Sequence, residues 1–182
     1  MSPPATDDPF DALGLPHTFR LDAGRIRSAH VRLLASLHPD RAASPVEAAD
    51  LARRAAAVNA AERALADPLA RGRALLARLG GQPVERMPPS FLAETMELRE
   101  SLDEALAGGD VDGIAAARAD AQERREAELE AIASAFDEAF AAAPGSPARA
   151  DAAGRAAESL ARLRYVTRLI ERCDDPAGMD GG

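Results

Sequence analysis

His38 and Asp40 flank Pro39, and their side-chain types are the ones in this sequence that most readily suggest chemistry. An imidazole and a carboxylate can act together as a general acid and a general base. An enzyme of that kind would also need a serine or cysteine nucleophile, a glycine-rich phosphate loop or a cluster of metal ligands. No such group accompanies the pair. We therefore expect no catalytic residue, no metal site and no cofactor.

The His-Pro-Asp tripeptide is expected to form a turn between two antiparallel helices. Proline fixes its own φ, lacks an N–H and disfavours helical geometry at the preceding residue. Asp22 can cap a helix that runs to about residue 37. One face of this helix carries Ile26, Ala29, Leu33 and Leu37. A longer helix over residues 46–66 has apolar residues at heptad spacing, namely Leu51, Val58 and Leu65.

Three arginines lie on the first helix of this hairpin. At ~100° per residue, Arg25 and Arg32 share one flank and Arg27 lies on the other. Taken alone, they indicate only a solvated face.

Shorter helices are predicted on both sides of the hairpin. Asp8 can cap a single helical turn that Gly14 ends. Asp67 is followed by proline at the first helical position of a further helix, which ends at Gly80. We expect residues 1–7 to be a disordered leader and residues 8–80 to form one domain.

A second helical domain is expected after a linker over residues 81–89, which is rich in glycine and proline. Residues 90–173 hold three helical stretches and predict a three-helix bundle, with Ser90 as the first cap. On the last helix, one stripe is predicted to face the core, with Tyr165 and Leu169 off it: Leu160, Leu163, Val166 and Ile170. Residues 174–182 are expected to be a disordered tail. With no strand signal, the fold class is all-α.

Leu92 and Met96 form a second apolar spot on the first helix of this bundle. They project to a different side from the core residues Phe91, Leu98 and Leu102. A bundle helix with one seam does not need this spot, so it indicates either a docking surface or an unusually wide apolar stripe.

Charge and cysteine content exclude several classes of protein. The 182-residue chain has a net charge of −8, which argues against a general nucleic-acid binder. Residues 1–79 hold 11 arginines and 9 acidic residues, whereas residues 80–182 hold 11 and 21. This asymmetry suggests two modules with different partners. Cys173 is the single cysteine, so we expect no iron on the purified chain. Without a signal peptide or a membrane-spanning run, a cytoplasmic location is expected.

The residues around the turn resemble a J-domain. Residues 25–34 followed by His38-Pro39-Asp40-Arg41 are similar to its helix II and signature loop, and residues 58–68 are similar to its helix III. The tripeptide alone is weakly specific, but joined to both flanking helices at this separation it is strongly specific.

The rest of the chain resembles the HscB family, the co-chaperones dedicated to iron–sulfur cluster assembly. Residues 68–80 end in a Leu-Leu pair and a glycine, as in that family, and residues 91–104 are the most specific part of the resemblance. The resemblance covers about residues 8–172. It is closer to the bacterial form of the family, since the cysteine-rich N-terminal extension of eukaryotic relatives is absent.

The resemblance implies two binding surfaces. A J-domain would stimulate ATP hydrolysis by a DnaK-class chaperone such as HscA, through His38, Pro39, Asp40, Arg25, Arg27 and Arg32. A C-terminal bundle would present the iron–sulfur scaffold protein IscU, through Leu92, Ala93, Met96, Glu97, Arg99, Glu100 and Tyr165. The implied partners include no nucleic acid and no membrane.

The sequence departs from the family pattern at four positions. Glu62 and His30 stand where aromatic residues are usual, Leu37 replaces a tyrosine, and Ala93 is smaller than the expected methionine or leucine. These differences bear on packing and on affinity for the scaffold.

Two other interpretations remain. A J-domain co-chaperone could present a different client on the acidic bundle. A structural helical adaptor would use His-Pro-Asp only as a turn, and ATPase stimulation that survives Asp40→Asn would favour it.

Overall fold

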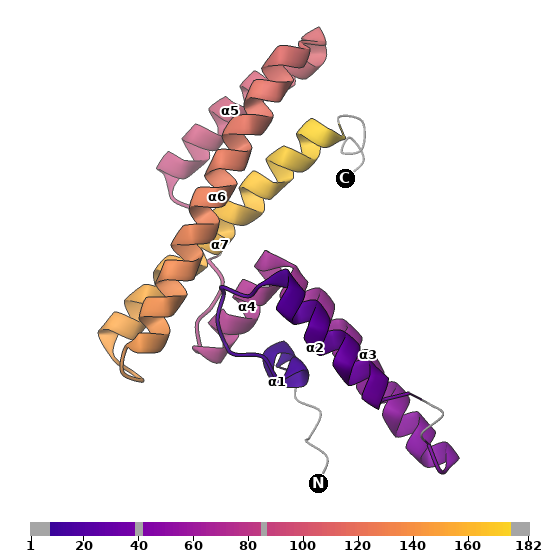
Figure 1. Cartoon of the computed structure of the whole chain (residues 1–182). Helices are drawn as coiled ribbons and strands as arrows, with labels where there is room; N and C mark the ends of the chain where they lie inside the picture. The colour runs from indigo at the N-terminus through magenta and orange to yellow at the C-terminus, as the bar shows by residue number, and fades with distance from the viewer. Residues whose placement is uncertain (1–7, 39–41, 85–86, 176–182) are drawn as a thin grey trace. The chain divides into compact units, whose positions relative to one another are not determined.

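The computed structural model describes residues 8–38, 42–84 and 87–175 (Figure 1). This part of the chain is helical and contains no strand, which confirms the predicted all-α class. None of its helices is both long enough and apolar enough to cross a membrane. The chain divides into two compact units between Leu79 and Gly80.

The first unit is built on an antiparallel pair of helices, α2 (Ala23–Ser36) and α3 (Pro45–Ala66), flanked by α1 (Pro9–Leu13) and α4 (Pro68–Arg78). The carboxylates of Asp8, Asp22 and Asp67 accept hydrogen bonds from backbone N–H groups in the first turns of α1, α2 and α4. The core of this unit includes Phe10, Leu13, Phe19, Ile26, Ala29, Leu37, Leu51, Val58, Leu65, Leu75 and Leu76. Leu33, predicted on the core face, is only partly buried.

Two of the polar contacts between elements of this unit are at least partly buried. His30 Nε2 lies 2.8 Å from Asn59 Oδ1 and links α2 to α3. The Arg71 guanidinium is buried, donates to the Leu65 carbonyl at 2.9 Å and stacks 4.9 Å from the centre of the Phe19 ring. Burial lowers the pKa of Arg71, and the nearby Asp67 carboxylate opposes that shift.

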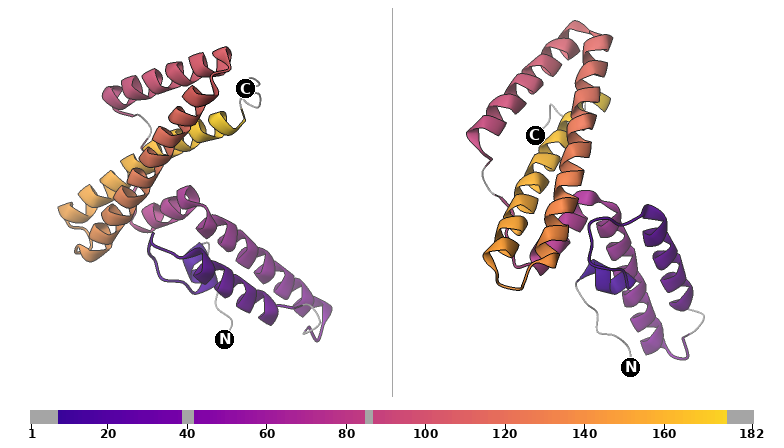
Figure 2. Two further views of the ribbon diagram at one scale, coloured as in Figure 1. Left: turned by 45° about the horizontal axis from the view of Figure 1, so that its top comes forward. Right: turned by 60° about the vertical axis from the view of Figure 1, so that its left-hand side comes forward.

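The second unit consists of α5 (Pro89–Gly108), α6 (Val111–Ala141) and α7 (Pro147–Asp174). Helices α6 and α7 form a long antiparallel hairpin. Helix α5 is joined to the start of α6 by a short turn, and the two helices diverge with distance from that turn (Figure 2). Small side chains let the hairpin helices approach closely, because the residues buried between them include Ala133, Ala135, Ala139, Ala152, Ala153, Ala156 and Ala157. A separate cluster under α5 contains Leu102, Ala121, Val166, Leu169 and Cys173.

Two predictions for this unit are wrong. Helix α5 begins at Pro89 after Pro88, which offers no capping side chain, so Ser90 is not its cap. Leu169 was placed off the core stripe of the last helix but is buried, whereas Ile170 is only partly buried. The reason is that α7 packs against α5 as well as α6, so its buried face is wider than a single seam.

Candidate protein-interaction surfaces

The exposed surface of α2 carries, on its two flanks, the basic residues predicted to bind a chaperone. Arg25, Arg27 and Arg32 are all exposed, and within the described part of the chain none of their guanidinium groups pairs with a carboxylate. The helix ends at Ser36, and its cap Leu37 is buried. This anchor places the exposed His38 directly after the helix. Pro39 and Asp40 lie outside the described residues.

The exposed face of α5 carries six of the seven residues predicted to bind the scaffold. Leu92 and Met96 are 44% and 58% exposed and lie one helical turn apart. The other exposed residues of the prediction on this helix are Ala93, Glu97, Arg99 and Glu100. The result is a small apolar spot with polar residues around it, on a helix whose core-facing side holds the buried Leu102.

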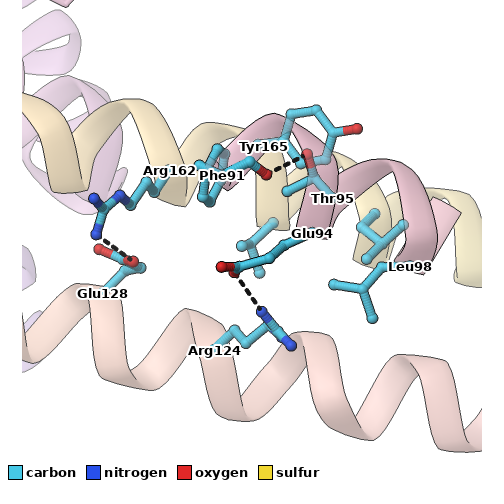
Figure 3. A pocket seen from close by; sticks show the side chains of 10 residues that line it. Phe91, Glu94, Thr95, Leu98, Arg124, Glu128, Arg162 and Tyr165 are labelled. Carbon is cyan, nitrogen blue, oxygen red and sulfur yellow. Dashed lines mark hydrogen bonds and ion pairs between the residues drawn. The ribbon is translucent and has the colours of Figure 1, made fainter. Parts of the chain in front are cut away.

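A cleft lies beside α5, between its N-terminal half and the α6–α7 hairpin (Figure 3). Its volume of about 180 Å³ is smaller than the ~300 Å³ from which small-molecule sites usually start. The lining residues are Phe91, Glu94, Thr95, Leu98, Arg124, Glu128, Arg162, Tyr165, Val166 and Leu169. We interpret the cleft as a packing gap at the divergence of α5, rather than as a small-molecule site.

Charged and aromatic contacts bridge this cleft. Glu94 on α5 lies 4.0 Å from Arg124 on α6, and Glu128 on α6 lies 3.9 Å from Arg162 on α7. The Arg162 guanidinium also lies 5.7 Å from the centre of the Phe91 ring. These long, partly exposed ion pairs contribute little individually, about 0–1 kcal/mol each.

Tyr165 on α7 is the remaining residue predicted at the scaffold surface, and the structure brings it to α5. Its ring meets Phe91 edge to face, with centroids 5.9 Å apart. Tyr165 also lines a groove together with Arg99, Arg168, Leu169 and Arg172. Tyr165 and Arg99, which are 66 positions apart in the sequence, therefore belong to one surface.

Sequence reasoning missed several residues of this region. Thr95 is buried and donates its hydroxyl to the carbonyls of Phe91 and Leu92 at 2.8 and 2.9 Å. The side chain of Glu128, near the middle of α6, is only 18% exposed although it is charged. Arg168 lines the groove beside Tyr165. Its spacing of three residues from Tyr165 was the one available signal.

In the described residues, one group of side chains has the composition of a metal site: Asp8, Asp11 and His17, with ligand atoms within 4.8 Å of one another. Arg78 Nη1 lies 2.9 Å from Asp8 and 3.5 Å from Asp11, so both carboxylates already pair with a guanidinium group of the protein. The His17 ring also contacts the Phe10 ring in a tilted arrangement, with centroids 5.3 Å apart. We interpret this group as a structural ion-pair cluster that ties α1 to α4.

Comparisons with known proteins give one consistent result. Residues 87–174 match the family described as the HSCB C-terminal oligomerisation domain. The chain is 33% identical to the co-chaperone protein HscB homolog of Burkholderia multivorans over 90% of each chain. It is 32% identical to that of Azoarcus sp. over 92% of each.

Two solved structures share the fold. The human co-chaperone protein HscB has a TM-score of 0.78 and 25% identity, and the match covers 96% of this chain and 84% of that one. The chaperone HscB from Vibrio cholerae has a TM-score of 0.74 and 26% identity, and the match covers 92% and 95%. The first unit is thus the J-domain and the second the C-terminal helical bundle of such proteins. The chain belongs to the HscB family of co-chaperones.

Proposed function

We propose that this chain is a J-domain co-chaperone of iron–sulfur cluster assembly, acting in the cytoplasm. It would stimulate the ATPase of a DnaK-class, HscA-like chaperone and deliver an IscU-like scaffold protein to it. The observation that carries the proposal is the exposed arginine face of α2 directly before His38, in a chain whose second unit exposes Leu92 and Met96.

The chaperone side of the proposal rests on electrostatics. Arg25, Arg27 and Arg32 present charge that no carboxylate of the described residues neutralises. A basic face of this kind attracts an acidic partner surface, and it raises the association rate more than the final affinity. Asp40, two positions after His38 in the sequence, would accept charge-assisted hydrogen bonds from an arginine of the chaperone. The chain would perform no chemistry, because it would only bias the chaperone toward its hydrolysis-competent state.

The scaffold side rests on desolvation. Leu92 and Met96 would be the apolar anchors, and the polar residues around them would exclude water from the contact. Linking the scaffold and the J-domain in one chain raises the effective concentration of the client at the chaperone, without any new contact.

Steady-state ATPase measurements test both sides. The chaperone and scaffold of the same organism are assayed with the wild-type chain, with His38→Gln and with Arg32→Gln. Arg73→Gln is the matched control, because Arg73 is an exposed arginine of the same unit on α4 rather than α2. We expect stimulation that needs His38, weakens with Arg32→Gln more than with the control, and rises when the scaffold is added.

The other outcomes separate the alternatives. Stimulation that needs His38 but is indifferent to the scaffold would keep the J-domain and assign the bundle to a different client. No stimulation, with a chaperone shown to be active, would overturn the co-chaperone proposal.

A further inference from the structure

The groove beside Tyr165 concentrates positive charge on an otherwise acidic unit. Arg99 on α5 and Arg168 and Arg172 on α7 line it, together with Tyr165 and Leu169. Residues 80–182 carry 21 acidic residues against 11 arginines, so a local excess of arginine is unusual for this unit. Three of these arginines lie around one small surface.

A single carboxylate organises two of the three arginines. Asp103 Oδ1 accepts a hydrogen bond from Arg172 Nε at 2.9 Å and forms an ion pair with Arg172 Nη2 at 2.8 Å. Asp103 Oδ2 lies 3.7 Å from Arg99 Nε. One negative charge is thus shared between two guanidinium groups, and both are held at the groove.

Arg168 is the third arginine of the groove and does not pair with Asp103. It is exposed, and no carboxylate of the described residues pairs with it. The groove therefore has a net positive charge and one guanidinium free to bind an anion. Arginine is well suited to this, because its planar fork can donate two parallel hydrogen bonds to a carboxylate.

The groove continues the apolar spot of α5. Leu92, Met96, Arg99 and Asp103 follow one another at steps of four, three and four residues, so they form a single stripe along the helix. A partner that covers Leu92 and Met96 reaches Arg99 by extending about one helical turn further along α5.

We propose that this groove, formed by Arg99, Arg168 and Arg172 around Tyr165, binds an acidic side chain of the same protein partner that covers Leu92 and Met96. The inference rests on the proposed function, since it deepens the scaffold-binding surface. A carboxylate of a protein fits better than a phosphate of a nucleic acid. The contiguous apolar stripe matches a protein surface, and the acidic remainder of the unit repels a polyanion.

Binding of the scaffold protein to the full chain, measured by calorimetry at low and moderate salt, tests the inference. Arg168→Gln is compared with Arg164→Gln, its matched control: Arg164 is an exposed α7 arginine that does not line the groove. We expect Arg168→Gln to raise Kd about 3- to 10-fold at low salt, with the difference shrinking as salt screens it. The control should change Kd less than about twofold.

A charge swap identifies the occupant. Arg168→Glu should weaken binding further, and an Asp or Glu to Arg change at one position of the scaffold should restore it. No binding by the wild-type chain would overturn the proposed function and this inference with it. Wild-type binding with equal affinities for the Gln variants of Arg168 and Arg164 would overturn the groove alone. So would a charge swap that no scaffold position rescues.

Discussion

Removing the two exposed apolar side chains of α5 should weaken scaffold binding without weakening the fold. Full burial of a leucine or methionine side chain contributes ~1.5–3 kcal/mol. Leu92 is 44% exposed and Met96 is 58% exposed. Burying these exposed parts under the scaffold would therefore contribute roughly 1 kcal/mol for Leu92 and roughly 1.3 kcal/mol for Met96 to the free energy of binding. Leu92→Ala combined with Met96→Ala should therefore raise Kd by about 10- to 40-fold, since ~1.4 kcal/mol corresponds to a factor of ten.

The assay is calorimetric titration of the scaffold protein into each variant, with a helicity check by circular dichroism. Val111→Ala is the control, because Val111 is 75% exposed at the start of α6 and is not among the predicted scaffold contacts. We expect the double variant to keep its unfolding temperature within a few degrees, since both side chains are exposed.

Two results would refute the reasoning. A Kd for the double variant within twofold of the wild type would show that the pair is not an anchor. An equal loss in Val111→Ala would show that any exposed apolar side chain of this unit matters as much.

Three further predictions concern the fold. Arg71→Ala should destabilise the first unit by about 2–4 kcal/mol in urea unfolding, because it removes a charged hydrogen bond to Leu65 and a ring contact; a loss under ~0.5 kcal/mol would contradict this. A double-mutant cycle of His30→Ala and Asn59→Ala should give a coupling of about 0.5–1.5 kcal/mol, whereas additive effects would show that their contact stabilises nothing. Burial raises the pKa of the Cys173 thiol, with the Asp174 charge adding to the shift, so less thiolate is present at a given pH. Maleimide labelling of the native chain at pH 8 should be at least about tenfold slower than in urea and should accelerate with rising pH, and equal rates would refute this.

The helix boundaries of the first unit were predictable because their signals are local. Asp22 and Asp67 cap the helices that the sequence assigned to them, since a capping aspartate needs only its own next three residues. Leu51, Val58 and Leu65 are buried as their heptad spacing predicted, because that spacing places all three along the side of α3 that faces the core of the unit.

The second unit was harder to predict because its burial depends on which helices face one another. Leu169 is buried because α5 covers it, and the sequence of α7 alone contains no sign of that cover. Thr95 can be buried because its hydroxyl donates hydrogen bonds to carbonyls of its own helix. These bonds remove the usual free-energy penalty for burying a polar group. Arg168 lines the groove beside Tyr165 because of the way α5 and α7 are aligned along one another. No local sequence pattern determines that alignment.

The divergence of α5 from the hairpin has a consequence for dynamics. Among the described side chains of α5, only Thr95 and Leu102 are fully buried, and the helix starts without a capping side chain. Its N-terminal half therefore rests on little core, and its opening costs less free energy than the opening of α6 and α7. Its amide hydrogens should exchange with solvent earlier than those of the hairpin. The helix that presents Leu92 and Met96 thus retains local freedom that a bound partner would remove, so part of the binding energy would be spent on ordering this segment.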